Sequence, residues 1–81
     1  MIEVKENVYD VIRRNIKYYR KLNNMTQADF AEKMGLSHDF IRQVESSKSG
    51  KHFSMNSLQM AADVLGVKLY MLFKEEINEE E

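Results

Sequence analysis

The chain has 81 residues, of which 43% are hydrophobic, contains no cysteine and no proline, and carries a formal net charge of −1. Its length predicts one domain near the small end of what folds without staples, and the missing cysteines exclude disulfide and thiolate chemistry and favour a reducing compartment, the cytoplasm. No stretch is long and apolar enough for a membrane-spanning helix, and the acid-containing N-terminus differs from a signal peptide.

The charges are unevenly distributed along the chain. Five of the 13 acidic residues lie in the last seven, "EEINEEE", so residues 1–74 carry 12 basic and 8 acidic side chains and a net charge of +4. We therefore expect one domain over residues 1–74 and an acidic tail over residues 75–81. A modestly basic body is compatible with a polyanionic partner.

Apolar residues recur at spacings of three and four along the whole chain, which predicts an all-α fold. The first helix is predicted to end at "NNM", because Asn24 suits the left-handed conformation that often terminates helices. Its inward face is expected to consist of Val8, Ile12, Ile16, Tyr19 and Leu22.

The stretch "TQADFAEKMGLSHDFIRQVE" predicts two helices joined by a tight turn. Thr26 is expected to cap the second helix, with Asp29 as the reciprocal cap, and Ser37 to cap the third. Ala31, a small residue where the helices cross, and Gly35, which lets the chain reverse, permit a steep corner. This is the sequence logic of a helix-turn-helix. The side chains expected inside are Phe30, Ala31, Met34, Ile41 and Val44.

Two further helices complete a predicted set of five. Ser54 is expected to cap the fourth helix and Gly66 to end it. The short segment "KLYMLF" predicts the fifth, although Lys68 stands where a capping residue is expected. The inward residues of these two helices are expected to be Met55, Leu58, Ala62, Leu65, Leu69, Leu72 and Phe73.

The third helix carries polar side chains on its outer side that suit DNA bases. At about 100° per residue, His38, Asp39, Arg42, Gln43 and Ser46 gather on one side. Their heads are hydrogen-bond donors and acceptors of the kinds that read base edges in a major groove. Gln43 suits adenine, Asp39 a cytosine amino group and His38 guanine. The alternative is an ordinary solvated helix face.

Residues 8–73 resemble the phage-repressor/Cro type of helix-turn-helix domain, the XRE family. The resemblance rests on "TQADFAEKMGLS", "FIRQVE", "SLQMAADVLGV" and "LYMLF" at matching spacing. It implies a compact five-helix bundle of the lambda-repressor-like type, with the helix-turn-helix in helices 2 and 3. It also implies a sequence-specific transcriptional regulator, possible kinds being phage repressors, antitoxins and restriction–modification controllers. Such a protein would bind double-stranded DNA as a homodimer through a recognition helix over residues 38–46.

The resemblance also assigns roles outside the recognition helix. It implies that Gln27 contacts a phosphate and that Arg20 and Glu45 form an ion pair, which we expect to fix orientation more than it stabilises. After Glu45 the loop "SSKSGKHFS" is longer than is usual in the family and lacks its proline, so we expect a mobile loop that contacts the DNA backbone or, alternatively, stays in solvent. The expected backbone contacts are Gln27, Ser37, Ser46, Lys48, Ser49 and Lys51, and His52 of the same loop could join them.

The fifth helix carries more apolar surface than so short a helix needs. A two-fold operator requires a dimer, so Tyr70, Met71 and Phe73 are expected, with the end of the fourth helix, at an isologous interface between two copies of the chain. The alternative is that these side chains merely close the core.

Two other classes of function are less favoured by the sequence. A protein-interaction module of antitoxin or anti-repressor type, which keeps the fold without binding DNA, would be favoured by Phe40 on the third helix and by the acidic tail. Phe40 could equally touch a thymine methyl group or pack against a neighbouring helix. An enzyme is not expected, because there are only two histidines, no metal-spaced carboxylate pair and no Gly-rich phosphate loop. We expect no cofactor, no metal and no membrane partner.

Overall fold

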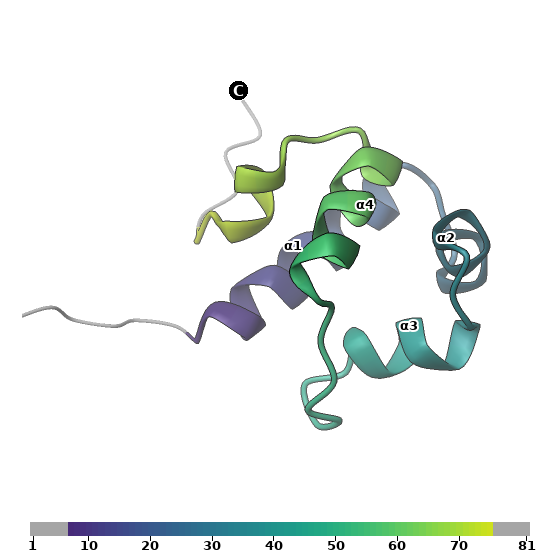
Figure 1. Cartoon of the computed structure of the whole chain (residues 1–81), viewed down its shortest axis with the longest axis horizontal. Helices are drawn as coiled ribbons and strands as arrows, with labels where there is room; N and C mark the ends of the chain where they lie inside the picture. The colour runs from purple at the N-terminus through teal and green to yellow at the C-terminus, as the bar shows by residue number, and fades with distance from the viewer. Residues whose placement is uncertain (1–6, 76–81) are drawn as a thin grey trace, which may run out of the picture.

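The computed structural model describes residues 7–75, and this part of the chain contains four α-helices, a short 3-10 helix and no strand (Figure 1). The all-α prediction is confirmed. Most of the acidic tail lies outside the described residues. The elements are α1 (Val8–Leu22), α2 (Gln27–Met34), α3 (His38–Val44), α4 (Met55–Leu65) and the 3-10 helix η1 (Leu69–Phe73).

The prediction of a fifth α-helix is wrong, because the segment forms η1 instead. Lys68 precedes it in extended conformation and makes no capping hydrogen bond with its side chain. The N–H of Met71 donates to the carbonyl of Lys68 at 3.0 Å, a 3-10 spacing. Five residues without a cap offer too few bonds to offset the nucleation of an α-helix, and short 3-10 pieces are common in such places.

The three caps predicted from the sequence, Thr26, Ser37 and Ser54, are confirmed, and α1 has a cap that was not predicted, Asn7. The Thr26 hydroxyl accepts from Asp29 N–H at 3.0 Å, and the Asp29 carboxylate accepts from Thr26 N–H at 2.9 Å. These bonds, the backbone one first, lower the pKa of Asp29 below its ordinary value of 3.8. The caps of α1, α3 and α4 are Asn7, Ser37 and Ser54.

The core lies where α1, α2, α3 and α4 meet and is closed by Leu72 of η1. Phe30, at the corner of α2, is fully buried. The inward predictions are confirmed for Ile12, Ile16, Tyr19, Phe30, Ala31, Met34, Ile41, Val44, Leu58, Ala62, Leu65 and Leu72.

Three apolar residues predicted to be inside are exposed instead. Val8 is 47% exposed, and Leu22 and Met55 are each 62% exposed. Each is the first or last residue of its helix, where fewer neighbouring turns cover a side chain. Val11 and Phe53 are buried although neither was predicted to be.

Asn15, a polar side chain in the middle of α1, is completely buried. Its Nδ2 donates to the carbonyls of Leu72 at 2.9 Å and Lys74 at 2.8 Å, with a longer contact to Met71 at 3.4 Å. Its Oδ1 is buried with no hydrogen-bond partner among the described residues. Asn15 therefore fastens η1 to α1 by satisfying carbonyls that the end of a 3-10 helix leaves open.

We expect Asn15→Ala to lower the free energy of unfolding by about 1–3 kcal/mol, because carbonyls around Leu72 lose their donor while they stay buried. Urea denaturation followed by circular dichroism measures this loss. Lys17→Ala, at an exposed position of the same helix, is the control and should change stability by less than about 0.5 kcal/mol. Equal midpoints for Asn15→Ala and the unaltered protein would show that Asn15 does not hold η1.

Candidate nucleic-acid interface

The turn between α2 and α3 sets the position of the predicted recognition helix. Gly35 has a φ of +70°, in the left-handed region that favours glycine. Its N–H and that of Leu36 donate to the carbonyls of Glu32 at 3.1 Å and Ala31 at 3.0 Å, which satisfies two of the carbonyls at the end of α2. In Figure 1, α3 consequently lies along one edge of the bundle, roughly across α2.

The outer side of α3 exposes the polar residues that the sequence singled out. His38, Asp39 and Arg42 are exposed, and Gln43 is half-buried. The Asp39 carboxylate joins the other two long side chains of this face: Oδ1 accepts from Arg42 Nη2, and Oδ2 accepts from Gln43 Nε2 at 2.9 Å. We call His38, Asp39, Arg42 and Gln43 the reading face.

The recognition helix is shorter than the predicted 38–46. It ends at Val44, Glu45 follows as its C-cap, and Ser46 already belongs to the loop. Ser46 is half-buried, and its Oγ accepts from the N–H of Lys48 at 3.3 Å. Ser46 is therefore a loop residue at the edge of the reading face.

Arg20 and Glu45 form a bidentate ion pair that joins α1 to the end of α3. Nε of Arg20 donates to Oε2 of Glu45 at 2.7 Å, and Nη2 donates to Oε1 at 3.0 Å. Only 7% of the Arg20 side chain and 2% of the Glu45 side chain are exposed. Nη1 of Arg20 also donates to the carbonyl of Met25 at 2.7 Å, just before α2. One guanidinium thus links α1, the start of α2 and the end of α3.

Gln27, the first residue of α2, belongs to the same network. Its Nε2 donates to Oε1 of Glu45 at 3.0 Å, and the side chain is half-buried. An amide nitrogen has two hydrogens, so one remains for another acceptor. The structure therefore gives Gln27 a fixed orientation beside the corner of α2 and α3.

The loop after α3 is folded onto the helix by serine side chains. The Ser49 hydroxyl donates to the carbonyl of Gln43 and accepts from the N–H of Lys51 at 3.1 Å. The bond to the Gln43 carbonyl uses the hydroxyl hydrogen of Ser49, so that hydrogen is not available to a phosphate. The hydroxyl groups of Ser37 and Ser46 accept from backbone N–H groups, so their own hydroxyl hydrogens remain available to another acceptor. Lys48 and Lys51 are exposed.

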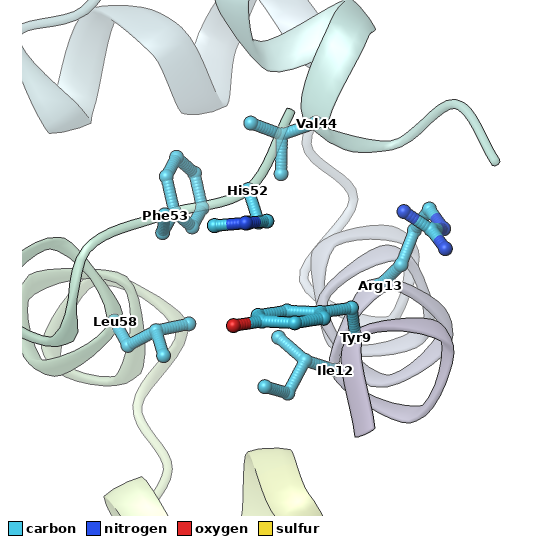
Figure 2. Close-up of a pocket in the computed structure, with 7 residues that line it drawn as sticks. All are labelled: Tyr9, Ile12, Arg13, Val44, His52, Phe53 and Leu58. Atoms are coloured by element: carbon cyan, nitrogen blue, oxygen red, sulfur yellow. The ribbon is translucent and has the colours of Figure 1, made fainter. Parts of the chain in front are cut away.

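Two aromatic contacts, not predicted from the sequence, hold the far end of this loop. The His52 ring stacks on Tyr9 of α1 with ring centroids 4.2 Å apart and planes within 10° (Figure 2). Phe53 is buried and packs against Phe40 of α3, with centroids 5.9 Å apart. The sequence allowed Phe40 either a contact with a base or a packing contact, and in the structure Phe40 makes the packing contact. This feature no longer favours an interaction module.

The proposed interface residues of η1 differ in exposure. Tyr70 is 65% exposed, whereas Met71 and Phe73 are partly buried against the core. Phe73 also lines an open groove of about 510 Å³ between η1 and the first turns of α1 and α4. Tyr70 is thus the side chain of this segment with the most surface to offer a partner.

Residues 7–75 contain no group of three or more metal-ligating side chains that could hold an ion. None of their helices is both long and apolar enough to cross a bilayer.

A family model, a relative of known sequence and two crystal structures are similar to this chain. A family model described as Helix-turn-helix matches residues 16–72. A Methanocaldococcus jannaschii protein, named as an uncharacterized HTH-type transcriptional regulator, is 37% identical over 71 residues, which are 84% of this chain and 100% of the relative. Two crystal structures share the fold. One is the hypothetical transcription factor NHTF from Neisseria, with a TM-score of 0.74, 24% identity, and coverage of 82% of this chain and 72% of that one. The other is SinR, a master regulator for biofilm formation in complex with DNA, with a TM-score of 0.69, 27% identity, and coverage of 78% and 98%. The chain therefore belongs to the XRE-type helix-turn-helix family.

Proposed function

We propose that this protein is a sequence-specific DNA-binding transcriptional regulator that places α3 in the major groove. The observation that carries the proposal is the reading face, a row of exposed or half-buried polar side chains on a helix whose opposite side is packed into the core. The similarity to SinR, whose structure was solved in complex with DNA, supports it. The DNA-binding domain would comprise residues 1–74, with the acidic tail over 75–81 outside it.

Three side chains of the reading face have groups that suit particular bases. Gln43 can pair with the N6 and N7 edge of adenine, and Arg42 with O6 and N7 of guanine. His38, at the first position of α3, suits guanine as well. Asp39 lies among them and bonds to two of them, a role developed below.

The DNA backbone would be held from both sides of α3. Gln27 has a spare amide hydrogen at the start of α2, and Lys48 and Lys51 extend from the loop after α3. Ser37 and Ser46 can donate their hydroxyl hydrogens to phosphate oxygens. Ser49 supports these contacts from within by fastening the loop to Gln43.

The protein would bind a two-fold operator as a homodimer. One recognition helix covers only a half-site, so two copies must present their helices about one DNA turn apart. Tyr70, with Met71 and Phe73 beside it, would form the isologous contact.

Selection of bound duplexes from a random pool should yield a palindromic consensus. Gln43→Ala should then relax the preference at one position per half-site by about 1–3 kcal/mol, because one bidentate base contact is lost. Lys48→Ala should weaken binding to all sequences alike and reduce the slope of log affinity against log salt by about 1. Fluorescence anisotropy over a salt series measures both.

Lys68→Ala is the matched control, since Lys68 is an exposed lysine just before η1, outside α2, α3 and the loop that follows α3. Its salt slope should equal that of the unaltered protein. A selected pool without any consensus would refute the proposed function.

The Arg20–Glu45 pair should orient α3 more than it stabilises the domain. Arg20→Met alone should cost about 3–5 kcal/mol, because the buried Glu45 charge loses its partner. The double variant Arg20→Met, Glu45→Leu should regain most of this stability, since no buried charge remains, yet should still bind the operator more weakly.

Thermal unfolding and operator titration of both variants separate the two effects. If the double variant binds the operator as tightly as the unaltered protein does, the ion pair has no orienting role.

We expect Tyr70→Glu to shift the protein from dimer to monomer, because a charge would be buried at a two-fold contact against its own copy. Sedimentation equilibrium at tens of micromolar measures the association. Met60→Glu provides the control, because Met60 is an exposed apolar residue of α4 outside the proposed interface. Unaltered protein that sediments as a monomer at this concentration would exclude the homodimer.

A further inference from the structure

We propose that Asp39 is a positioning residue, which holds Arg42 and Gln43 in the orientations that meet base edges and does not read a base itself. The inference rests on the proposed function. This role differs from the one expected from the sequence, in which Asp39 accepts a hydrogen bond from a cytosine amino group.

One carboxylate holds both long side chains of the reading face. Asp39 precedes Arg42 by three residues and Gln43 by four, the two spacings at which side chains on a helix become neighbours. Oδ1 accepts from Arg42 Nη2 and Oδ2 from Gln43 Nε2 at 2.9 Å, so each oxygen already has a donor before any DNA is present.

The bond to Gln43 determines which end of its amide faces which way. A carboxylate only accepts hydrogen bonds, so the NH2 end of the Gln43 amide must face Asp39 and the oxygen must face away. Pairing with adenine requires the amide to offer one donor and one acceptor in a defined order. Asp39 therefore selects one of two amide orientations, and the second Nε2 hydrogen and Oε1 remain for the base.

The bond to Arg42 leaves most of the guanidinium unused. Arg42 has five N–H donors, and the structure pairs one of its nitrogens with Asp39. The carboxylate also offsets the positive charge of Arg42, which reduces the attraction of the reading face for phosphates of any sequence. Asp39 thus favours selectivity over general affinity.

Stability does not explain the arrangement. The side chains of Arg42 and Asp39 are both 62% exposed, and ion pairs with this exposure contribute little to folding. The bonds instead restrict side chains that would otherwise sample many rotamers before they bind.

A substitution series on the selected operator tests the proposal. Affinity is measured for the operator, for each single base-pair replacement and for an unrelated duplex, with Asp39→Ala, Arg42→Ala, Gln43→Ala and the double variant Asp39→Ala, Gln43→Ala. Asp39→Ala should relax the same positions that Arg42→Ala and Gln43→Ala relax, each by about fivefold to tenfold. It should also bind the unrelated duplex severalfold more tightly, because one negative charge is gone.

The double variant should be no less selective at the Gln43 position than Gln43→Ala alone, because a positioning residue has no effect once the residue that it positions is absent. Asp39→Asn, with one acceptor oxygen left, should lie between Asp39→Ala and the unaltered protein.

Asp63→Ala is the matched control. Asp63 accepts from Gln59 Nε2 at 3.2 Å across four residues of α4, so its removal deletes an equal charge and a similar contact away from α3. It should leave every base preference unchanged. In the free protein, Asp39→Ala should shift the NMR signals of the Gln43 side-chain amide and not those of Gln59.

The outcomes separate this inference from the proposed function. If the unaltered protein selects a consensus but Asp39→Ala relaxes a position untouched by Arg42→Ala and Gln43→Ala, Asp39 reads a base and the inference is wrong. It is equally wrong if Asp39→Ala alters no preference or leaves the Gln43 amide signals in place. If the unaltered protein selects nothing, the proposed function fails first.

Discussion

The Glu45 carboxylate is the point on which the corner of the domain depends. It is buried where three helices meet, and it accepts from Arg20 of α1 and Gln27 of α2 at the end of α3. A buried charge tolerates few arrangements of its partners, so this contact restricts the angle of α3 more than apolar packing alone would. Gly35 permits the turn at the corner, and under the proposed role of the ion pair Glu45 would favour one geometry of it.

The other contacts around α3 extend this restriction to the loop that follows. Ser49 bonds the loop to the carbonyl of Gln43, and His52 stacks on Tyr9 of α1. A loop expected to be mobile is therefore attached at both ends to rigid elements. Under the proposed function, Lys48 and Lys51 would meet the DNA backbone with less conformational entropy left to lose.

Local interactions made much of this fold predictable from the sequence. The features that depend on packing between distant parts of the chain were not predictable in this way. Thr26 with Asp29, and Gly35, act within four residues of their own positions, so their pattern is visible in the sequence. The burial of Asn15 depends on where η1 packs, 57 residues along the chain. The contact between Tyr9 and His52 has no local signature either.

At the candidate site the identities of the outer residues followed from the helical period. The link from Asp39 to Arg42 and Gln43 also has a local signature, because the three residues stand three and four positions apart on one helix.

Selectivity and affinity are assigned to adjacent segments of the chain under these proposals. Asp39 offsets the positive charge of Arg42, so the reading face gains little from phosphates in general. The loop contributes the exposed, positively charged side chains of Lys48 and Lys51. The two segments meet at Gln43, whose side chain bonds to Asp39 while its carbonyl accepts from Ser49. A shift of the loop toward a phosphate would therefore act on the residue that reads the base, and this mechanical link would make backbone binding and base recognition interdependent.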